Sequence, residues 1–331
     1  MLALVSVPIF PTNAARADPN YIARHVVQGV IVNIIRAIHD NLQQRGTTRS
    51  ESRTSFTDED STAAGTYDDA FAALGYNGMP TKAVPQPQPA QSSFQYGATV
   101  TGTGERDQNT DETGSTTVTN SFTATGSADA TKIGIFNASD TLTLLILGSR
   151  SWAQAPGTDS TTNGVAGTVS YANGGFSADF TIQSQSTKST ITIGNVNAAA
   201  DSNSVSYSEN VQYKFDLPHA WFIEPTVGMT YTHTQVVASQ GGHSTEIQGG
   251  ARIGTEVIWN GVHIQGTVTA TAFSPVSDSP VTLQTGHLGG RGVAKWNLLW
   301  SDNFSSFIEV HGTLISHSSI YGTTGGLRWS F

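Results

Sequence analysis

Cysteine is absent from this chain of 331 residues. That absence excludes disulfide bridges and every metal site built on thiolates. Charged residues are also scarce, at 12% of the chain, which is about half of the ~25% found in soluble domains. The formal net charge of −9 argues against nucleic acid as a partner, because a nucleic-acid site needs a basic surface.

Long apolar runs and catalytic motifs are missing as well. The longest near-apolar runs fall far short of the ~18 residues that a membrane-spanning helix needs. The sequence contains no G-x-S-x-G elbow, no H-E-x-x-H motif and no glycine loop for phosphate. Its 9 histidines are scattered, and none pair at metal-ligand spacing. We therefore expect no enzyme activity, no cofactor and no metal site.

The first 17 residues read as an export signal. Leu2 to Phe10 form a short apolar stretch, and Ala15-Arg16-Ala17 fits a small-x-small cleavage site before Asp18. The basic residues that usually open such a signal are missing. The alternatives are therefore a truncated signal, a true start further upstream, or a frayed apolar terminus.

Residues 18–91 are expected to form a helical and linker segment. Apolar residues recur at three- and four-residue spacing over Tyr21–Gln44, which predicts a helix. Its length of roughly 36 Å would be enough to cross a bilayer-sized barrel. A second short helix is expected over Tyr67–Tyr76. The prolines from Pro80 to Pro89 then predict a stiff, extended linker.

From Ser92 to the C-terminus, residues 92–331, the sequence alternates between apolar and polar residues and predicts twelve antiparallel strands. They are Ser92–Thr103, Thr116–Phe136, Thr141–Ala153, Gly164–Tyr171, Phe176–Ser186, Ser204–Phe215, Ala220–Val237, Ser244–Ile258, Val262–Phe273, Gly286–Trp300, Phe304–Ser316 and Ile320–Phe331.

The connections between these strands are predicted to alternate in length. Short turns are expected at Asn137–Asp140, Ala172–Gly175, Asp216–His219, Asn260–Gly261 and Ser301–Asn303. Longer polar loops are expected at Gly104–Ser115, Gln154–Asn163, Thr187–Asn203, Ala238–His243 and Ser274–Thr285. Short turns at one end and long loops at the other are typical of outer-membrane barrels.

Each predicted strand has one apolar and one polar face. Between Ala220 and Val237, for example, Trp221 and Ile223 share one face and Phe222 and Glu224 the other. A soluble β-sandwich would bury the apolar face, whereas a membrane barrel would turn it toward lipid. Small residues on that face favour the barrel, because a dry core packed to ~0.74 density needs larger side chains. They are Gly228, Gly249, Ala251, Gly266, Ala270, Gly290, Gly292 and Gly312. The fold class is therefore expected to be all-β, a 12-stranded antiparallel transmembrane β-barrel with an N-terminal helix that could enter the pore.

Charged residues on the polar face are the candidate functional residues. Opposite charges across a lumen can pair, hold a plug helix or set ion preference; the alternative is a stabilising network with no transport role. The predicted pore-lining residues are Glu224, Arg252, Arg291, Lys295, Glu309 and Arg328. His263 and His311 should also face the lumen, as solvated side chains.

The last strand has an aromatic and apolar face made of Tyr321, Leu327, Trp329 and Phe331. The C-terminal stretch Gly325–Phe331 and three others, Gly164–Tyr171, Gly175–Phe180 and Tyr213–Tyr231, resemble the β-domain of autotransporters, the type V secretion translocators. The resemblance covers about residues 92–331. It implies a twelve-stranded barrel in the bacterial outer membrane, a helix through the pore, and a C-terminal strand that the outer-membrane assembly machinery reads.

One departure from the family concerns the passenger. Members of the family carry a large passenger before the barrel, and here only Asp18 to Gln91 stand in that place. This segment is either a short exported passenger or a plug that stays in the pore. The family's self-cleaving asparagine pair has no clear match, so we expect no processing. The other functions left open are a passive outer-membrane channel or structural barrel, and a soluble secreted β-sandwich adhesin. We expect a monomer whose partners are outer-membrane lipid and the assembly machinery.

Overall fold

The computed structural model describes residues 94–110, 114–137, 140–193, 196–236, 241–259, 262–278, 288–315 and 318–331. The predicted signal, both predicted helices and the proline linker lie outside these ranges. Fourteen antiparallel strands occupy the described residues. They are β1 Phe94–Thr110, β2 Thr116–Ile133, β3 Asp140–Ala155, β4 Thr158–Asn173, β5 Phe176–Ile193, β6 Val196–Ala199, β7 Ser202–Tyr213, β8 Phe215–Leu217, β9 Trp221–Val236, β10 Gly242–Trp259, β11 Val262–Asp278, β12 Gly289–Ser301, β13 Phe304–Ile315 and β14 Ser318–Ser330.

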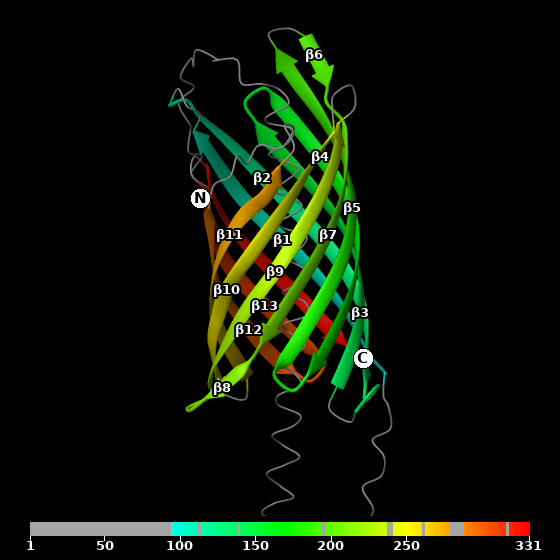
Figure 1. Ribbon diagram of the computed structural model, residues 1–331, viewed down its shortest axis with the longest axis vertical. Helices are drawn as coiled ribbons and strands as arrows, with labels where there is room; N and C mark the ends of the chain where they lie inside the picture. The colour runs from blue at the N-terminus through cyan, green and yellow to red at the C-terminus, as the bar shows by residue number, and fades with distance from the viewer. Residues whose placement is uncertain are drawn as a thin grey trace, which may run out of the picture.

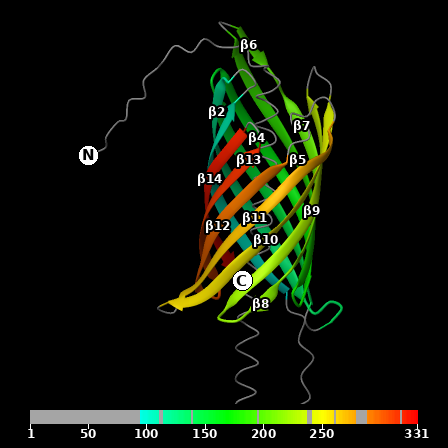
Figure 2. The same cartoon turned by 60° about the vertical axis from the view of Figure 1, so that its left-hand side comes forward.

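Twelve of these strands form one closed barrel (Figure 1). Each long strand pairs with its neighbours in chain order, and the ring closes where β1 pairs with β14. At this closing seam Val100 lies opposite Leu327. The backbones of Tyr96 and Phe331 exchange two hydrogen bonds of 3.1 and 3.0 Å. The short strands β6 and β8 pair with β5 and β9 and lie at opposite ends of the barrel (Figures 1 and 2). The prediction of a twelve-stranded antiparallel barrel is confirmed.

The apolar side chains of the wall point outward. Val100, Ile146 and Val227 are each more than half exposed, whereas most of the buried side chains are Ser, Thr, Asn, Gln or charged residues. This inside-out arrangement excludes the soluble β-sandwich, in which the apolar face would be buried. Such a wall is stable when lipid covers it. No helix among the described residues is long and apolar enough to cross a membrane.

Where the structure describes them, the predicted long loops are mostly strand, so that part of the prediction was wrong. β1 continues to Thr110 and β2 begins at Thr116, and only Pro156 and Gly157 separate β3 from β4. Gly157 has a φ of 71°, a backbone conformation suited to glycine in a tight turn. These stretches are polar but rich in threonine, which favours strands. Their polarity therefore marks the edge of the apolar band rather than the end of the strand.

Gly228 is a second correction. A Cβ at this position would lie 2.9 Å from Oδ1 of Asn210, and Asn210 is buried inside the barrel. Gly228 therefore faces the lumen and does not belong to the apolar outer face.

Candidate functional site

All six predicted lumen residues lie on the inner face of the wall. Five of them are at most 6% exposed, and Arg291 is half-buried against the lumen-facing ring of Phe273. The strands that carry them are β9 for Glu224, β10 for Arg252, β12 for Arg291 and Lys295, β13 for Glu309 and β14 for Arg328. These six charged residues thus all come from the C-terminal half of the barrel, β9 to β14.

Glu224 and Arg252 form an ion pair. They are direct cross-strand partners, and Nη2 of Arg252 donates to Oε2 of Glu224 at 2.7 Å. The guanidinium carbon also lies 5.3 Å from the centre of the Phe222 ring. A charge-assisted hydrogen bond and a cation–π contact together compensate for the loss of water around this arginine.

Two other lumen cations, Lys295 and Arg291, also lie over phenylalanine rings. Nζ of Lys295 lies 4.3 Å from the centre of the Phe307 ring, and Lys295 is the cross-strand partner of Glu309. The guanidinium carbon of Arg291 lies 4.9 Å from the centre of the Phe273 ring, and its Nη1 donates to Oε1 of Gln248 at 3.5 Å.

Each of these three rings lies against a glycine on the next strand. Direct cross-strand partners are Phe222 with Gly254, Phe273 with Gly289 and Phe307 with Gly326. A Cβ at any of the three glycines would collide with the ring. The ring therefore fills the place of the missing side chain and covers the glycine backbone. These lumen-facing phenylalanines break the rule of an apolar outer face and a polar inner face, so alternation alone gave no reason to expect them in the site.

Arg328 makes the first of two contacts that cross the closing seam. Its Nη1 and Nη2 donate to the two carboxylate oxygens of Asp129, at 3.0 and 3.4 Å, and Nη1 also donates to Oγ1 of Thr99 at 3.3 Å. Arg328 is on β14 and Asp129 is on β2, so the pair passes over β1. It passes over Gly97, where a Cβ would meet both side chains. We call this contact the Arg328 clip.

His311 makes the second contact across the seam. Its Nδ1 lies 3.2 Å from Oε1 of Glu309, and its Nε2 lies 2.9 Å from Oε1 of Glu105. Because both ring nitrogens face carboxylate oxygens, the geometry suits a doubly protonated ring that donates two hydrogen bonds. The contact runs from β13 to β1 over Gly322 on β14, where a Cβ would meet both side chains. We call it the His311 clip. The expectation of a solvated His311 was wrong, since only 3% of the residue is exposed.

The opposite part of the lumen, from β3 to β9, is lined mainly by hydroxyl and amide groups. Hydroxyl pairs on neighbouring strands hydrogen bond to each other, which satisfies groups that the wall would otherwise leave unpaired. These pairs are Ser160–Ser189, Thr162–Thr187, Thr168–Thr181, Ser204–Thr234, Ser206–Thr232 and Ser208–Thr230, at 2.8 to 3.1 Å. The lumen thus has a charged side and a neutral side.

Asp140 organises the turn between β2 and β3, at the end of the barrel that holds the C-terminus. Its carboxylate accepts hydrogen bonds from the backbone N–H groups of Ile135, Phe136 and Asn137 at 2.8, 2.9 and 3.2 Å. Burial of the side chain disfavours its charged form, but these donors outweigh that effect and lower the pKa of Asp140. The turn is held by an ionised carboxylate.

The four residues of the predicted C-terminal signal all point outward, away from the lumen. Tyr321, Leu327, Trp329 and Phe331 are between 40 and 73% exposed, and the ring of Trp329 lies 5.6 Å from that of Phe304. Leu327, Trp329 and Phe331 follow one another on the outer face beside the seam, and Tyr321 lies further along the same face, beyond Thr323 and Gly325. This face is the one turned toward lipid.

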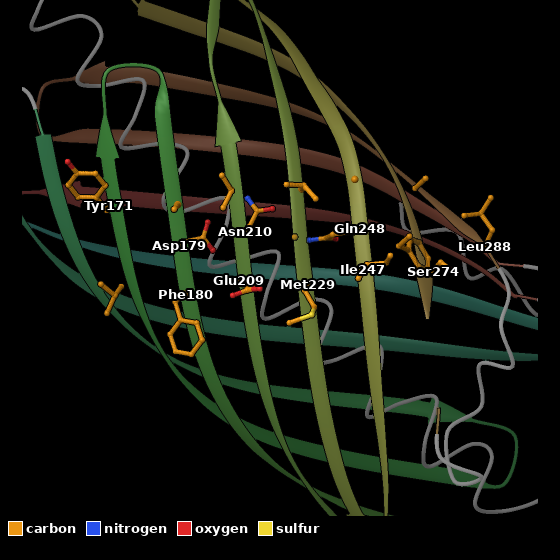
Figure 3. A pocket seen from close by; sticks show the side chains of 18 residues that line it. Tyr171, Asp179, Phe180, Glu209, Asn210, Met229, Ile247, Gln248, Ser274 and Leu288 are labelled. Carbon is orange, nitrogen blue, oxygen red and sulfur yellow. The ribbon is translucent and has the colours of Figure 1, made fainter. Parts of the chain in front are cut away.

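The outer wall also has an apolar hollow of about 810 Å³ that spans β4 to β11. Figure 3 shows Phe180 and Met229 on one side of the sheet, and Asp179 and Asn210 on the other. The outward-facing lining includes Glu209, between Tyr207 and Val211 on β7.

The carboxylates of the two clips were not predicted from the sequence. Asp129 and Glu105, the carboxylates of the two clips, lie 199 and 206 positions from their partners. Their only local signal was a charge at an inward-facing position of a strand. Among the described residues, no group of three His, Asp or Glu side chains could hold a metal ion.

Comparison with solved structures places this barrel beside translocator domains. The β-domain of the Bordetella autotransporter BrkA aligns with a TM-score of 0.58 and 16% identity, over 71% of this chain and 99% of that one. The translocator domain of the autotransporter NalP from Neisseria meningitidis aligns with a TM-score of 0.56 and 12% identity, over 82% of this chain and 98% of that one. Neither a protein-family model nor a curated protein sequence matches. The chain therefore has the fold of an autotransporter β-domain, and this fold, together with its lipid-facing wall, belongs in the bacterial outer membrane.

Proposed function

We propose that this protein is an outer-membrane translocator of the autotransporter type, which exports or is plugged by its own segment 18–91. The observation that supports the proposal is a closed twelve-strand barrel with a polar lumen, in the same fold as two translocator domains. A polypeptide in transit needs a wall that neither holds it by strong charge contacts nor offers it apolar surface. Charges that pair with each other, beside a neutral hydroxyl wall, meet that need.

The paired charges of the lumen support a role in keeping the pore in shape. Arg252 forms an ion pair with Glu224, and Arg328 forms one with Asp129. Cations held in this way contribute less attraction to passing ions than cations that face water. We propose that these pairs maintain the lumen, and that a plugging segment would meet the hydroxyl side and the charged side together.

The partners that we propose are the outer-membrane assembly machinery and lipid, with the barrel as a monomer. The apolar side chains of Tyr321, Leu327, Trp329 and Phe331 lie along the closing strand, where recognition would precede closure. Removal of Phe331 should reduce insertion and leave protein in periplasmic aggregates. Outer-membrane levels equal to those of the unchanged chain would refute this role.

Protease digestion of intact cells tests export. Antibodies against segment 18–61 report whether that segment is cut from outside, and cleavage of engineered sites in the surface turns is the positive control. Cleavage of both supports export. If the surface sites are cut while segment 18–61 stays protected, export is wrong and a plug remains.

A planar bilayer separates a plugged translocator from a passive channel. The full chain should show little conductance, and the variant that lacks Tyr21–Gln91 should conduct more. Equal, large conductance in both would favour the passive channel.

A further inference from the structure

Two arginines with outward-facing side chains lie near the end of the barrel that is remote from the C-terminus. Arg106 is on β1 and Arg150 is on β3, and both are exposed. On β2 and β3, Phe122 and Trp152 are cross-strand partners between them. We call these four residues the rim patch.

The aromatic part of the rim patch is ordered by stacking. The rings of Phe122 and Trp152 lie 6.0 Å apart with an interplanar angle of 21°, and 51% and 41% of these residues are exposed. The guanidinium carbon of Arg150 lies 5.3 Å from the centre of the Trp152 ring. Because β3 runs away from the end that holds the C-terminus, Trp152 is nearer the remote rim than Arg150. The stem of Arg150 thus leaves the apolar band and its charged head reaches toward the rim, as long basic side chains do at a membrane boundary.

The arginines of the rim patch differ from those of the lumen. Arg252 and Arg328 each bind a carboxylate, whereas within the described residues Arg106 and Arg150 have no ion pair or hydrogen bond. Space is left between them, since a Cβ added at the outward-facing Gly104 would have no atom within 4 Å. Two exposed guanidinium groups beside an open stretch of wall have the charge and the space to bind an anionic group of the surrounding lipid.

The rim patch lies on the outer-leaflet side of the membrane. An even number of strands brings both ends of the barrel to the same side, and the polar stretches that continue the strands past the apolar band lie at the opposite end. In outer-membrane barrels the longer polar end is extracellular and the end with short turns is periplasmic. The opposite rim, which carries Arg106 and Arg150, then faces the outer leaflet.

We infer that the rim patch binds the phosphate of an outer-leaflet lipid. Guanidinium groups form bidentate hydrogen bonds with phosphate oxygens. The Phe122–Trp152 stack would cover the apolar part of the same lipid, and the open wall over Gly104 would receive it. The site begins on β1, one of the two strands of the closing seam, so a bound lipid would also brace β1 against β2 and β3.

Native mass spectrometry of the full chain in detergent tests this inference, with diphosphorylated lipid A as the probe. The double variant Arg106→Gln/Arg150→Gln should bind this lipid at least about tenfold more weakly than the unchanged chain, a difference of about 1.4 kcal/mol. The matched control is Lys132→Gln. Lys132 is also a cation over an aromatic ring, at 5.5 Å from the centre of Phe94, but it lies at the opposite rim. This variant should bind the lipid as tightly as the unchanged chain. Heat-dependent gel mobility verifies that each barrel is folded. Arg106→Lys/Arg150→Lys keeps the charge, and should bind at an intermediate level.

Four results would overturn the inference. They are equal binding by the double glutamine variant, equal loss with Lys132→Gln, equal binding of dephosphorylated lipid A, and displacement of the lipid by millimolar inorganic phosphate. The last result would indicate a site for free anions.

Discussion

The Arg328 clip offers a direct test of how the barrel is closed. Asp129 on β2 and Arg328 on β14 meet over β1, so this pair links strands that share no backbone hydrogen bonds. Changing Arg328 to Met leaves a buried carboxylate without its cation, and changing Asp129 to Leu does the reverse. The double variant removes both charges and keeps apolar bulk over Gly97.

The expected size follows from burial. The two side chains are 7% and 0% exposed, so solvent screens them little. Loss of one partner of such a pair costs about 3–5 kcal/mol in free energy of unfolding, while apolar replacement of both is close to neutral. Because the two single costs add to about 6–10 kcal/mol while the double change is close to neutral, the double-mutant cycle should give a coupling energy of at least about 6 kcal/mol in magnitude, above the ~0.5–3 kcal/mol usual for residues in contact.

The assay is urea unfolding in lipid vesicles, followed by hydrogen exchange of peptides from β1 and β14. The control cycle uses Glu224→Leu and Arg252→Met, because that pair joins β9 and β10, which already share backbone hydrogen bonds. The single variants of both cycles should lower the free energy of unfolding. Only those of the Arg328 clip should selectively raise hydrogen exchange in β1 and β14. Single changes that cost less than about 1 kcal/mol and simply add would refute the role of the clip in closure.

Three further changes test other parts of the barrel. Gly326→Ala would push a methyl group into the Phe307 ring and should cost about 1–3 kcal/mol in urea unfolding, whereas Gly104→Ala, which meets open space, should cost little. Trp329→Arg places a charge in lipid at a cost of at most about 2–4 kcal/mol, and cell fractionation should show less protein in the outer membrane. Because the pKa of Asp140 is lowered, its carboxylate stabilises the β2–β3 turn above the ordinary pKa of aspartate, and this contribution is lost as the pH falls through the lowered value. Asp140→Asn should therefore raise hydrogen exchange in that turn at neutral pH and remove its acid dependence.

The wall of the barrel could be predicted from the sequence because a strand has a period of two. Trp221 and Ile223 point outward and Glu224 points inward, as alternation requires. The same rule placed Arg328 and Trp329 on opposite faces of β14. Alternation within one strand is enough to predict which side chains point outward and which point inward, because this direction does not depend on the neighbouring strands.

The contacts inside the lumen could not be predicted in the same way. Which residues meet depends on the stagger between strands, and stagger is a property of the closed ring. His311 illustrates the difference. Its inward direction followed from alternation, but its position between Glu105 and Glu309 requires the pairing of β13, β14 and β1 in one register. The ends of the strands were missed for another reason, since polar threonine-rich stretches continue the sheet beyond the apolar band.

The glycines connect these observations. On the outer face, small residues were a sound argument for a lipid-facing wall, as at Gly290 and Gly292, where an added Cβ would meet no atom within 4 Å. On the inner face, glycine has a different purpose: Gly97 and Gly322 each lie beneath a contact between the two strands that flank them. A side chain at either position would block that contact, because the strands on both sides of a middle strand are roughly 10 Å apart. Inward-facing glycine therefore lets polar residues reach across a strand, and at the seam this ties β13 to β1 and β14 to β2. We therefore expect closure of the barrel to depend on these side-chain contacts as well as on the backbone pairing of β1 with β14.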